Sequence, residues 1–250
     1  VANGLVDYGK LLAENGELTA GLEKLFEAES LLLNLNNNEG LGFCFLNIGW
    51  IYQLQGESDL GLEYLKKALE IGEEIQKKRL LAKSAQTIAN VYQSREEFIF
   101  ALNYIKMSLR IFKKTANSYG YIHASADYIK ILLDQNHLTA AQKHLSLMEQ
   151  FQQEKLSKRS QIWIQISKAQ ILFAQRTLDG LKAARQILTE IIGDSEIPTQ
   201  QLTITYLLLC GVSVTNIIIQ QNVGLLDDAF QILKEILKLA EKQHSFFFFF

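Results

Sequence analysis

The sequence predicts an all-α solenoid built from about six antiparallel helical hairpins, and three observations support this fold class. The chain of 250 residues contains a single proline, Pro198, so long helices can run with little interruption. Hydrophobic residues make up 48% of the chain and charged residues 21%, which is enough apolar surface to form a core. Above all, residues of similar size recur at a fixed spacing, which is the mark of a stack of repeated units.

The repeat has a period of about 40 residues, within the range typical of solenoid proteins, and it holds over four units without a gap. Within each unit the small and the large apolar residues lie three or four positions apart, as they do on one face of a helix. The aligned positions are Tyr8-Gly9, Ile48-Gly49, Ile88-Ala89 and Tyr128-Ile129; Gly16, Gly56, Glu96 and Asn136; Gly21, Gly61, Ala101 and Ala141; and Leu25, Leu65, Ile105 and Leu145.

Each repeat unit is predicted to be a pair of helices. In the second unit we expect helices over about Gly42–Leu54 and Asp59–Gln76, with Gly56 at the C-terminal side of the first. A loop this short makes the two helices antiparallel neighbours. The solenoid is expected to cover residues 1–242, in units of about 1–40, 41–80, 81–120, 121–158, 160–195 and 200–242.

The last two units are less regular in sequence. The turn at Arg176–Gly180 is expected to be two or three residues longer than the others, and residues 193–198 form the one expected hinge. The uncharged stretch Gln200–Asn222 is long enough to span a membrane, but several threonines, a serine and flanking glutamines favour a buried helix and no membrane.

Both ends of the chain suggest a piece of a longer protein. It starts at Val1 inside a helical pattern and without a methionine. Five phenylalanines, Phe246–Phe250, close it without helical periodicity, so we expect residues 243–250 to be a disordered or artefactual tail outside the fold.

Charge and cysteine content exclude several classes of site. The formal net charge is −2, which argues against nucleic acid as a direct partner, and short basic clusters such as Lys77-Lys78-Arg79 are interpreted as solvated helix ends. Cys44 and Cys210 are too few for a disulfide framework or a zinc site and fit packing in a reducing compartment, the cytoplasm.

No catalytic motif is present in the sequence. It contains no G-x-S-x-G, GxxxxGK[ST], HExxH or GxGxxG pattern. The four histidines, His123, His137, His144 and His244, lack the further ligands of a metal site and are predicted to be structural or surface residues. We therefore predict no enzyme activity, no metal and no cofactor.

The order of residues in the second repeat unit resembles the tetratricopeptide repeat (TPR). The segment Asn47-Ile48-Gly49-Trp50-Ile51-Tyr52 is followed by Gly56, Gly61, Leu65 and Ala68. The usual repeat has about 34 residues, and the longer repeat found here resembles those of kinesin light chains and of some bacterial regulators. The resemblance covers residues 1–242, strongly over 1–150. It implies a right-handed superhelix whose first helices line a concave groove.

Four aligned positions of the first helices lie outside the packing columns and are the candidates for that groove. They are Lys10, Trp50, Asn90 and Lys130; Ala13, Gln53, Gln93 and Leu133; Asp7, Asn47, Thr87 and Asp127; and Asn3, Phe43, Lys83 and His123. Amide side chains can bond a peptide backbone in both senses, and an aromatic side chain can anchor it. The predicted partner-binding residues are Lys10, Phe43, Asn47, Trp50, Gln53, Lys83, Asn90, Gln93, His123 and Lys130.

Some members of this family hold a C-terminal carboxylate in a clamp of lysine and asparagine. Asn47, Lys83 and Asn90 match parts of that clamp, but its full set of basic residues is not matched. The sequence thus predicts a non-catalytic protein-interaction scaffold that binds a peptide or a partner helix. The alternative is the sensor or regulatory region of a larger signalling protein, such as a transcription regulator, kinase or cyclase.

Overall fold

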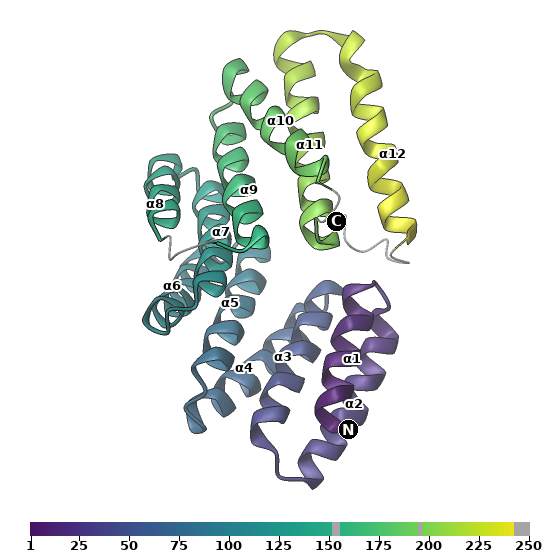
Figure 1. Ribbon diagram of the computed structural model, residues 1–250, viewed down its shortest axis with the longest axis vertical. Coiled ribbons are helices and arrows are strands. Elements are labelled where there is room, and N and C mark those ends of the chain that lie inside the picture. The colour runs from purple at the N-terminus through teal and green to yellow at the C-terminus, as the bar shows by residue number, and fades with distance from the viewer. Residues whose placement is uncertain (152–155, 195–196, 243–250) are drawn as a thin grey trace. The chain divides into compact units, whose positions relative to one another are not determined.

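The computed structural model describes residues 1–151, 156–194 and 197–242, and every regular element in these residues is helical (Figure 1). The helices fall into two compact parts, Val1–Asn117 and Ser118–Ala240, called here the N-terminal and C-terminal units. Consecutive helices pack on one another over residues 2–114 and over residues 118–220. The prediction of an all-α solenoid of helical hairpins is confirmed.

The N-terminal unit consists of three hairpins. Its helices are α1 (Ala2–Glu14), α2 (Leu18–Asn34), α3 (Asn38–Leu54), α4 (Ser58–Glu74), α5 (Lys78–Ser94) and α6 (Phe98–Lys114). The pairs α1–α2, α3–α4 and α5–α6 form the hairpins, and the first helices α1, α3 and α5 also pack side by side (Figure 1).

The C-terminal unit continues with α7 (Ser118–Asp134), α8 (Leu138–Gln150), α9 (Lys158–Ala174), α10 (Leu178–Ile192), α11 (Thr199–Gln220), a short 3₁₀ turn η1 (Val223–Leu225) and α12 (Leu226–Lys242). Arg185 on α10 joins the last helices, because its guanidinium donates to both carboxylate oxygens of Asp228 on α12, at 2.5 and 2.7 Å, and to the Ser213 hydroxyl on α11.

One turn geometry recurs from α1 to α8. After α3, the backbone N–H of Gly56 donates to Gln53 O at 3.1 Å and that of Glu57 to Tyr52 O at 2.9 Å, which is the Schellman arrangement. The middle residue of such turns has a positive φ, at Gly16, Asn36, Gly56, Gln76, Glu96, Ala116, Asn136 and Arg176. From Gly16 to Asn136 these positions are evenly spaced at half a repeat, so the turn inside a hairpin and the turn between hairpins share the same geometry.

Several predicted boundaries differ from the structure. The hairpins begin at Asn38, Lys78, Ser118 and Lys158, two or three residues before the expected unit starts, and α3 starts four residues before Gly42. Asn37 explains the earlier start of α3, because its side-chain oxygen accepts a hydrogen bond from Gly40 N at 2.9 Å and caps the helix. The expected tail, 243–250, lies outside the described residues.

The expectation of a longer turn at Arg176–Gly180 is wrong. The turn has three residues, 175–177, like the hairpin turns 15–17, 55–57, 95–97 and 135–137, and Arg176 has the positive φ of 53°. Gly180 lies inside the first turn of α10, where a Cβ would be 2.7 Å from the Leu172 carbonyl oxygen. The glycine therefore serves close packing between helices and does not mark a turn.

Helix α11 is more exposed than a core helix. Within it, Gln201–Gln220 is long and apolar enough to cross a membrane by length and composition, and 28% of its apolar window is buried. Ile218 is 68% exposed. The expectation of a buried helix is therefore met only in part.

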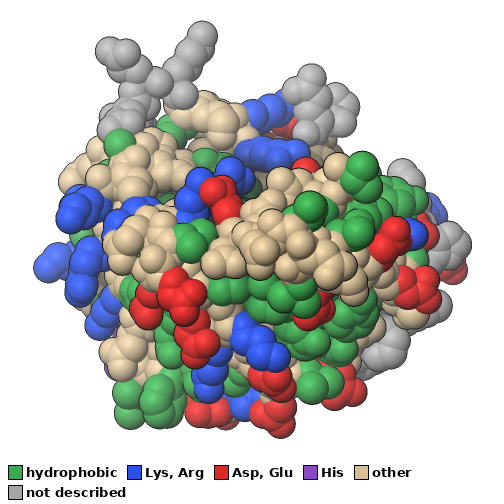
Figure 2. All heavy atoms as spheres, turned by 90° about the horizontal axis from the view of Figure 1, so that it is seen from below, with side chains coloured by type: hydrophobic (Ala, Val, Ile, Leu, Met, Phe, Trp, Pro, Cys, Tyr) green, Lys and Arg blue, Asp and Glu red, His purple; other side chains and the backbone are tan. Residues whose placement is uncertain are grey.

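The hairpin core follows the repeat columns. Leu25, Leu65 and Ile105 are fully buried at the same position of three successive hairpins. Outside the core, lysines, arginines and carboxylates are interleaved on the face shown in Figure 2, in keeping with the net charge of −2.

Candidate functional site

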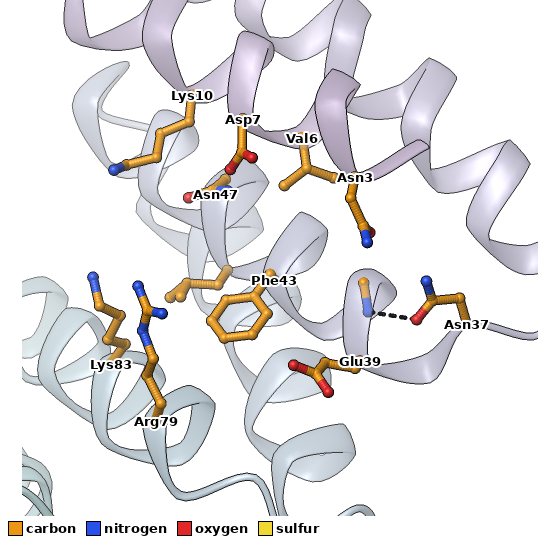
Figure 3. Close-up of a pocket in the computed structure, with 12 residues that line it drawn as sticks. Asn3, Val6, Asp7, Lys10, Asn37, Glu39, Phe43, Asn47, Arg79 and Lys83 are labelled. Carbon is orange, nitrogen blue, oxygen red and sulfur yellow. Dashed lines mark hydrogen bonds between the residues drawn. The ribbon is translucent and has the colours of Figure 1, made fainter. Parts of the chain in front are cut away.

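A hollow in the N-terminal unit lies where α1, α3 and α5 run next to one another (Figure 3). Its volume is about 530 Å³. All three helices are the first helices of their hairpins, which is where the repeat predicts a groove. We call this hollow the α1–α3–α5 pocket; its lining residues are Asn3, Val6, Asp7, Lys10, Asn37, Glu39, Gly40, Phe43, Leu46, Asn47, Arg79 and Lys83.

Three cationic side chains stand on one side of the pocket. Arg79 and Lys83 rise from adjacent turns of α5, and Lys10 extends from α1 toward the same side (Figure 3). Burial lowers the pKa of Lys83, and the positive charges of Lys10 and Arg79 lower it further, while Glu14 opposes them. A carboxylate placed here would relieve this repulsion and would be attracted to all three groups.

Part of the pocket's polar lining is already engaged. Glu39 pairs with Lys77 at 2.6 Å, and Lys10 pairs with Glu14 at 3.0 Å on the exposed surface of α1. Both pairs are solvent-exposed, so each is weak and exchangeable. Asn47 and Asp7 add an amide and a carboxylate to the same lining (Figure 3).

Phe43 supplies the apolar part of the pocket. The ring is half-buried and packs against the hydrophobic core of the N-terminal unit. The Arg79 guanidinium carbon lies 5.8 Å from the ring centroid, a cation–π contact that holds the arginine beside the pocket. The pocket lining thus combines this apolar ring with three cationic side chains and with the carboxylates of Asp7 and Glu39.

Four of the ten residues predicted from the sequence line this pocket: Lys10, Phe43, Asn47 and Lys83. The structure places Trp50 against the hydrophobic core, half-buried, and Gln53 half-buried on the same helix. On α5, Asn90 is half-buried and Gln93 is buried. A binding role for these four residues stays a prediction.

The remaining two predicted residues belong to α7 in the C-terminal unit. His123 packs between two rings, with centroids 6.0 Å from Tyr119 and 4.7 Å from Trp163, while Lys130 is exposed. Their contribution to a binding surface also stays a prediction.

Arg79 is the main residue that sequence reasoning missed. It was assigned with Lys77 and Lys78 to a solvated helix end, yet it stacks on Phe43 at the pocket wall. Its position in the repeat could have identified it, because Arg79 lies one repeat after Glu39 and one helical turn before Lys83.

The described residues show no group of three or more histidine, cysteine or carboxylate side chains that could hold a metal ion. Cys44 is buried, and its thiol donates to the Leu25 carbonyl oxygen at 3.1 Å. Burial raises the pKa of Cys44 to about 12, with a smaller contribution from Glu29, so this thiol is protonated at neutral pH and suited to packing.

Comparison with known proteins gives two findings. Residues 43–114 match the family model of the tetratricopeptide repeat. Among solved structures, the chain resembles the kinesin light chain nearly identical TPR-like repeats of Podosopora anserina, with a TM-score of 0.59 and 16% sequence identity over 75% of this chain and 94% of that chain. No curated protein matches the sequence. The matched segment runs from within α3 to the end of α6.

Proposed function

We propose that this chain is a non-catalytic scaffold that binds a peptide segment of another protein, because residues 43–114 match the tetratricopeptide-repeat model, the fold resembles TPR-like repeats, and such repeats generally mediate protein–protein interaction. The binding site is the α1–α3–α5 pocket. The observation that carries the proposal is the gathering of Lys10, Arg79 and Lys83 around a hollow with an aromatic wall.

The chemistry of the pocket favours an acidic segment with an apolar residue. Lys83 is partly buried and lies in the field of two other cations. Its charged form would therefore be stabilised most by a bound carboxylate. The Phe43 ring offers an apolar surface beside these charges. The alternative is a regulatory arm of a larger signalling protein, which would use the same pocket. Sequencing the reading frame on either side of residues 1–250 tests this alternative. Cytoplasmic location is part of the proposal.

Replacing Lys83 with methionine should weaken binding of an acidic peptide by about tenfold or more, since a charge-assisted hydrogen bond contributes roughly 1.5–3 kcal/mol. Methionine keeps most of the length of the side chain and removes a half-buried charge, so the fold should be retained. Fluorescence anisotropy with a labelled decapeptide of alternating leucine and aspartate, and with a lysine-for-aspartate twin, measures the effect.

Lys66→Met is the matched control, because Lys66 is an exposed lysine on α4 of the same unit and does not line the pocket. Its affinity should stay within about twofold of the wild type, as expected for an exposed charge outside the pocket. Equal losses in both variants would show general charge attraction and would contradict the pocket assignment.

A further inference from the structure

A second cluster of groups, separate from the residues of the α1–α3–α5 pocket, lies on the α5–α6 hairpin. The ring of Tyr92 stacks on Phe100 at 5.2 Å between centroids and on Tyr104 at 5.7 Å, with interplanar angles of 30° and 15°. Phe100 is 51% exposed, and both tyrosines are half-buried. We call these three rings the aromatic stack. Their exposed area is available for contact with another molecule.

The preceding hairpin contains the same arrangement, with a cation already on it. Tyr52 and Tyr64 lie one repeat before Tyr92 and Tyr104, and they stack at 5.8 Å with an interplanar angle of 25°. The Lys67 ammonium lies 4.8 Å from the centre of the Tyr64 ring and pairs with Glu63 at 2.6 Å. The chain itself therefore places a cation over one ring of this pair, Tyr64, and 6.0 Å from the centre of the Phe45 ring.

The α5–α6 hairpin lacks that cation. The position of Lys67 is taken by Met107 and that of Glu63 by Asn103. Within the part of the chain that the structure describes, no lysine or arginine lies over the ring of Tyr92 or Tyr104; the cation–π contacts involve Phe43, Phe45 and Tyr64. The two tyrosine rings are kept, and Phe100 adds a third ring at the position that Leu60 occupies in the preceding hairpin.

The Glu73 carboxylate of α4 acts on Tyr104 of the aromatic stack. Burial raises the pKa of Tyr104, and the neighbouring Tyr92 and the Glu73 carboxylate of α4 raise it further. The faces of aromatic rings are also electron-rich, so the field here attracts cations and disfavours acidic groups. An incoming basic side chain is the occupant that complements both the rings and Glu73.

We propose that the aromatic stack of Tyr92, Phe100 and Tyr104 binds a lysine or arginine side chain of a partner protein, in the position that Lys67 fills in the preceding hairpin. This site goes beyond the proposed acidic-peptide pocket and uses different residues. A partner that presents basic side chains to α5–α6 would fit it, and arginine suits it best because its planar guanidinium stacks on aromatic faces.

The test is an NMR titration of the whole chain with its nine tyrosines ring-labelled. The probe is the tripeptide amide acetyl-Gly-Arg-Gly, and its control carries citrulline, which keeps the shape of arginine without the charge. We expect the arginine probe to shift the ring signals of Tyr92 and Tyr104, and the citrulline probe to bind at least about tenfold more weakly. Equal binding of the two probes, or no shift at these rings, would overturn the proposal.

Two reciprocal substitutions, Met107→Lys and Lys67→Met, exchange the residues that the two hairpins carry at the same repeat position. Met107→Lys should place an internal ammonium on the stack and abolish the shifts of Tyr92 and Tyr104, whereas Asn103→Lys adds the same charge at the neighbouring exposed position and should preserve them. Lys67→Met should open the preceding site and add probe-dependent shifts of Tyr52 and Tyr64. Retained binding in Met107→Lys would overturn the proposal, and Lys83→Met, which tests the pocket, should leave these shifts unchanged.

Discussion

Replacing Gly49 with leucine is expected to cost the N-terminal unit about 4 kcal/mol or more of its free energy of unfolding. A Cβ at Gly49 would lie 2.8 Å from the Gly61 carbonyl oxygen and 2.7 Å from Leu65 Cγ. The backbone of α4 cannot give way as a flexible side chain would, so the hairpin α3–α4 must open. Leucine is a better helix former than glycine, so helix propensity works against this loss and cannot explain it.

Gly4→Leu is the matched control, because a Cβ at Gly4 of α1 would meet no atom within 4 Å. This variant should be as stable as the wild type or more stable, by up to about 1 kcal/mol. Urea unfolding followed by Trp50 fluorescence, in a Trp163→Phe background, reports on the N-terminal unit alone, since the chain has two tryptophans. Equal stability of the two leucine variants would contradict the close approach of α3 and α4.

Acidification from pH 6.5 to pH 4 is expected to remove roughly 3 kcal/mol of stability from the C-terminal unit through His144. The His144 ring packs edge-on against Tyr128 at 4.6 Å, and its Nε2 is buried with no hydrogen-bond partner among the described residues. Burial lowers the pKa of His144 from 6.5 to about 4. Between pH 6.5 and pH 4, His144 is protonated in the unfolded chain but stays neutral in the folded chain. The free energy of unfolding therefore falls as the pH falls.

His144→Phe should keep the edge-on ring contact and lose this part of the pH dependence. Other groups also titrate in this range, so the informative quantity is the difference in unfolding free energy between wild type and variant, followed by Trp163 fluorescence in a Trp50→Phe background. The wild type should lose stability relative to His144→Phe on acidification, by an amount that levels off only below pH 4. Parallel pH profiles of the two proteins would show that His144 is not buried in its neutral form.

The hairpin fold was predictable because the packing columns recur in the sequence itself. Gly49 and Gly61, Leu65 and Gly56 each indicate a close approach, a core position or a turn, and their counterparts one repeat away fix the register. Turn positions occupied by Gln76, Glu96 or Ala116 give no such signal, although their φ values are positive like those of the turn glycines. For the same reason Gly180 was misread as a turn, while Arg176 occupies the turn position.

The lining of the α1–α3–α5 pocket was predictable only in part. The first-helix columns identified Lys10, Phe43, Asn47 and Lys83 because a superhelix turns those positions to one surface. Arg79 was missed because its place beside Phe43 depends on how far α5 is displaced along α3, which the spacing of residues does not specify. The aromatic stack was not predicted, because the repeat spacing does not show that the rings of Tyr52 and Tyr92 are half-exposed.

The most direct test of the central claim, that an acidic segment binds in the α1–α3–α5 pocket, is the pKa of Lys83 measured by NMR of its side-chain nitrogen with and without the leucine–aspartate decapeptide. Lys83→Arg assigns the signal. In the free protein the pKa should lie below the usual lysine value of 10.5, because of burial and the charges of Lys10 and Arg79. The bound peptide should raise it, since a carboxylate stabilises the ammonium form. An unchanged titration of Lys83 at saturating peptide would contradict the account and place the binding site elsewhere on the chain.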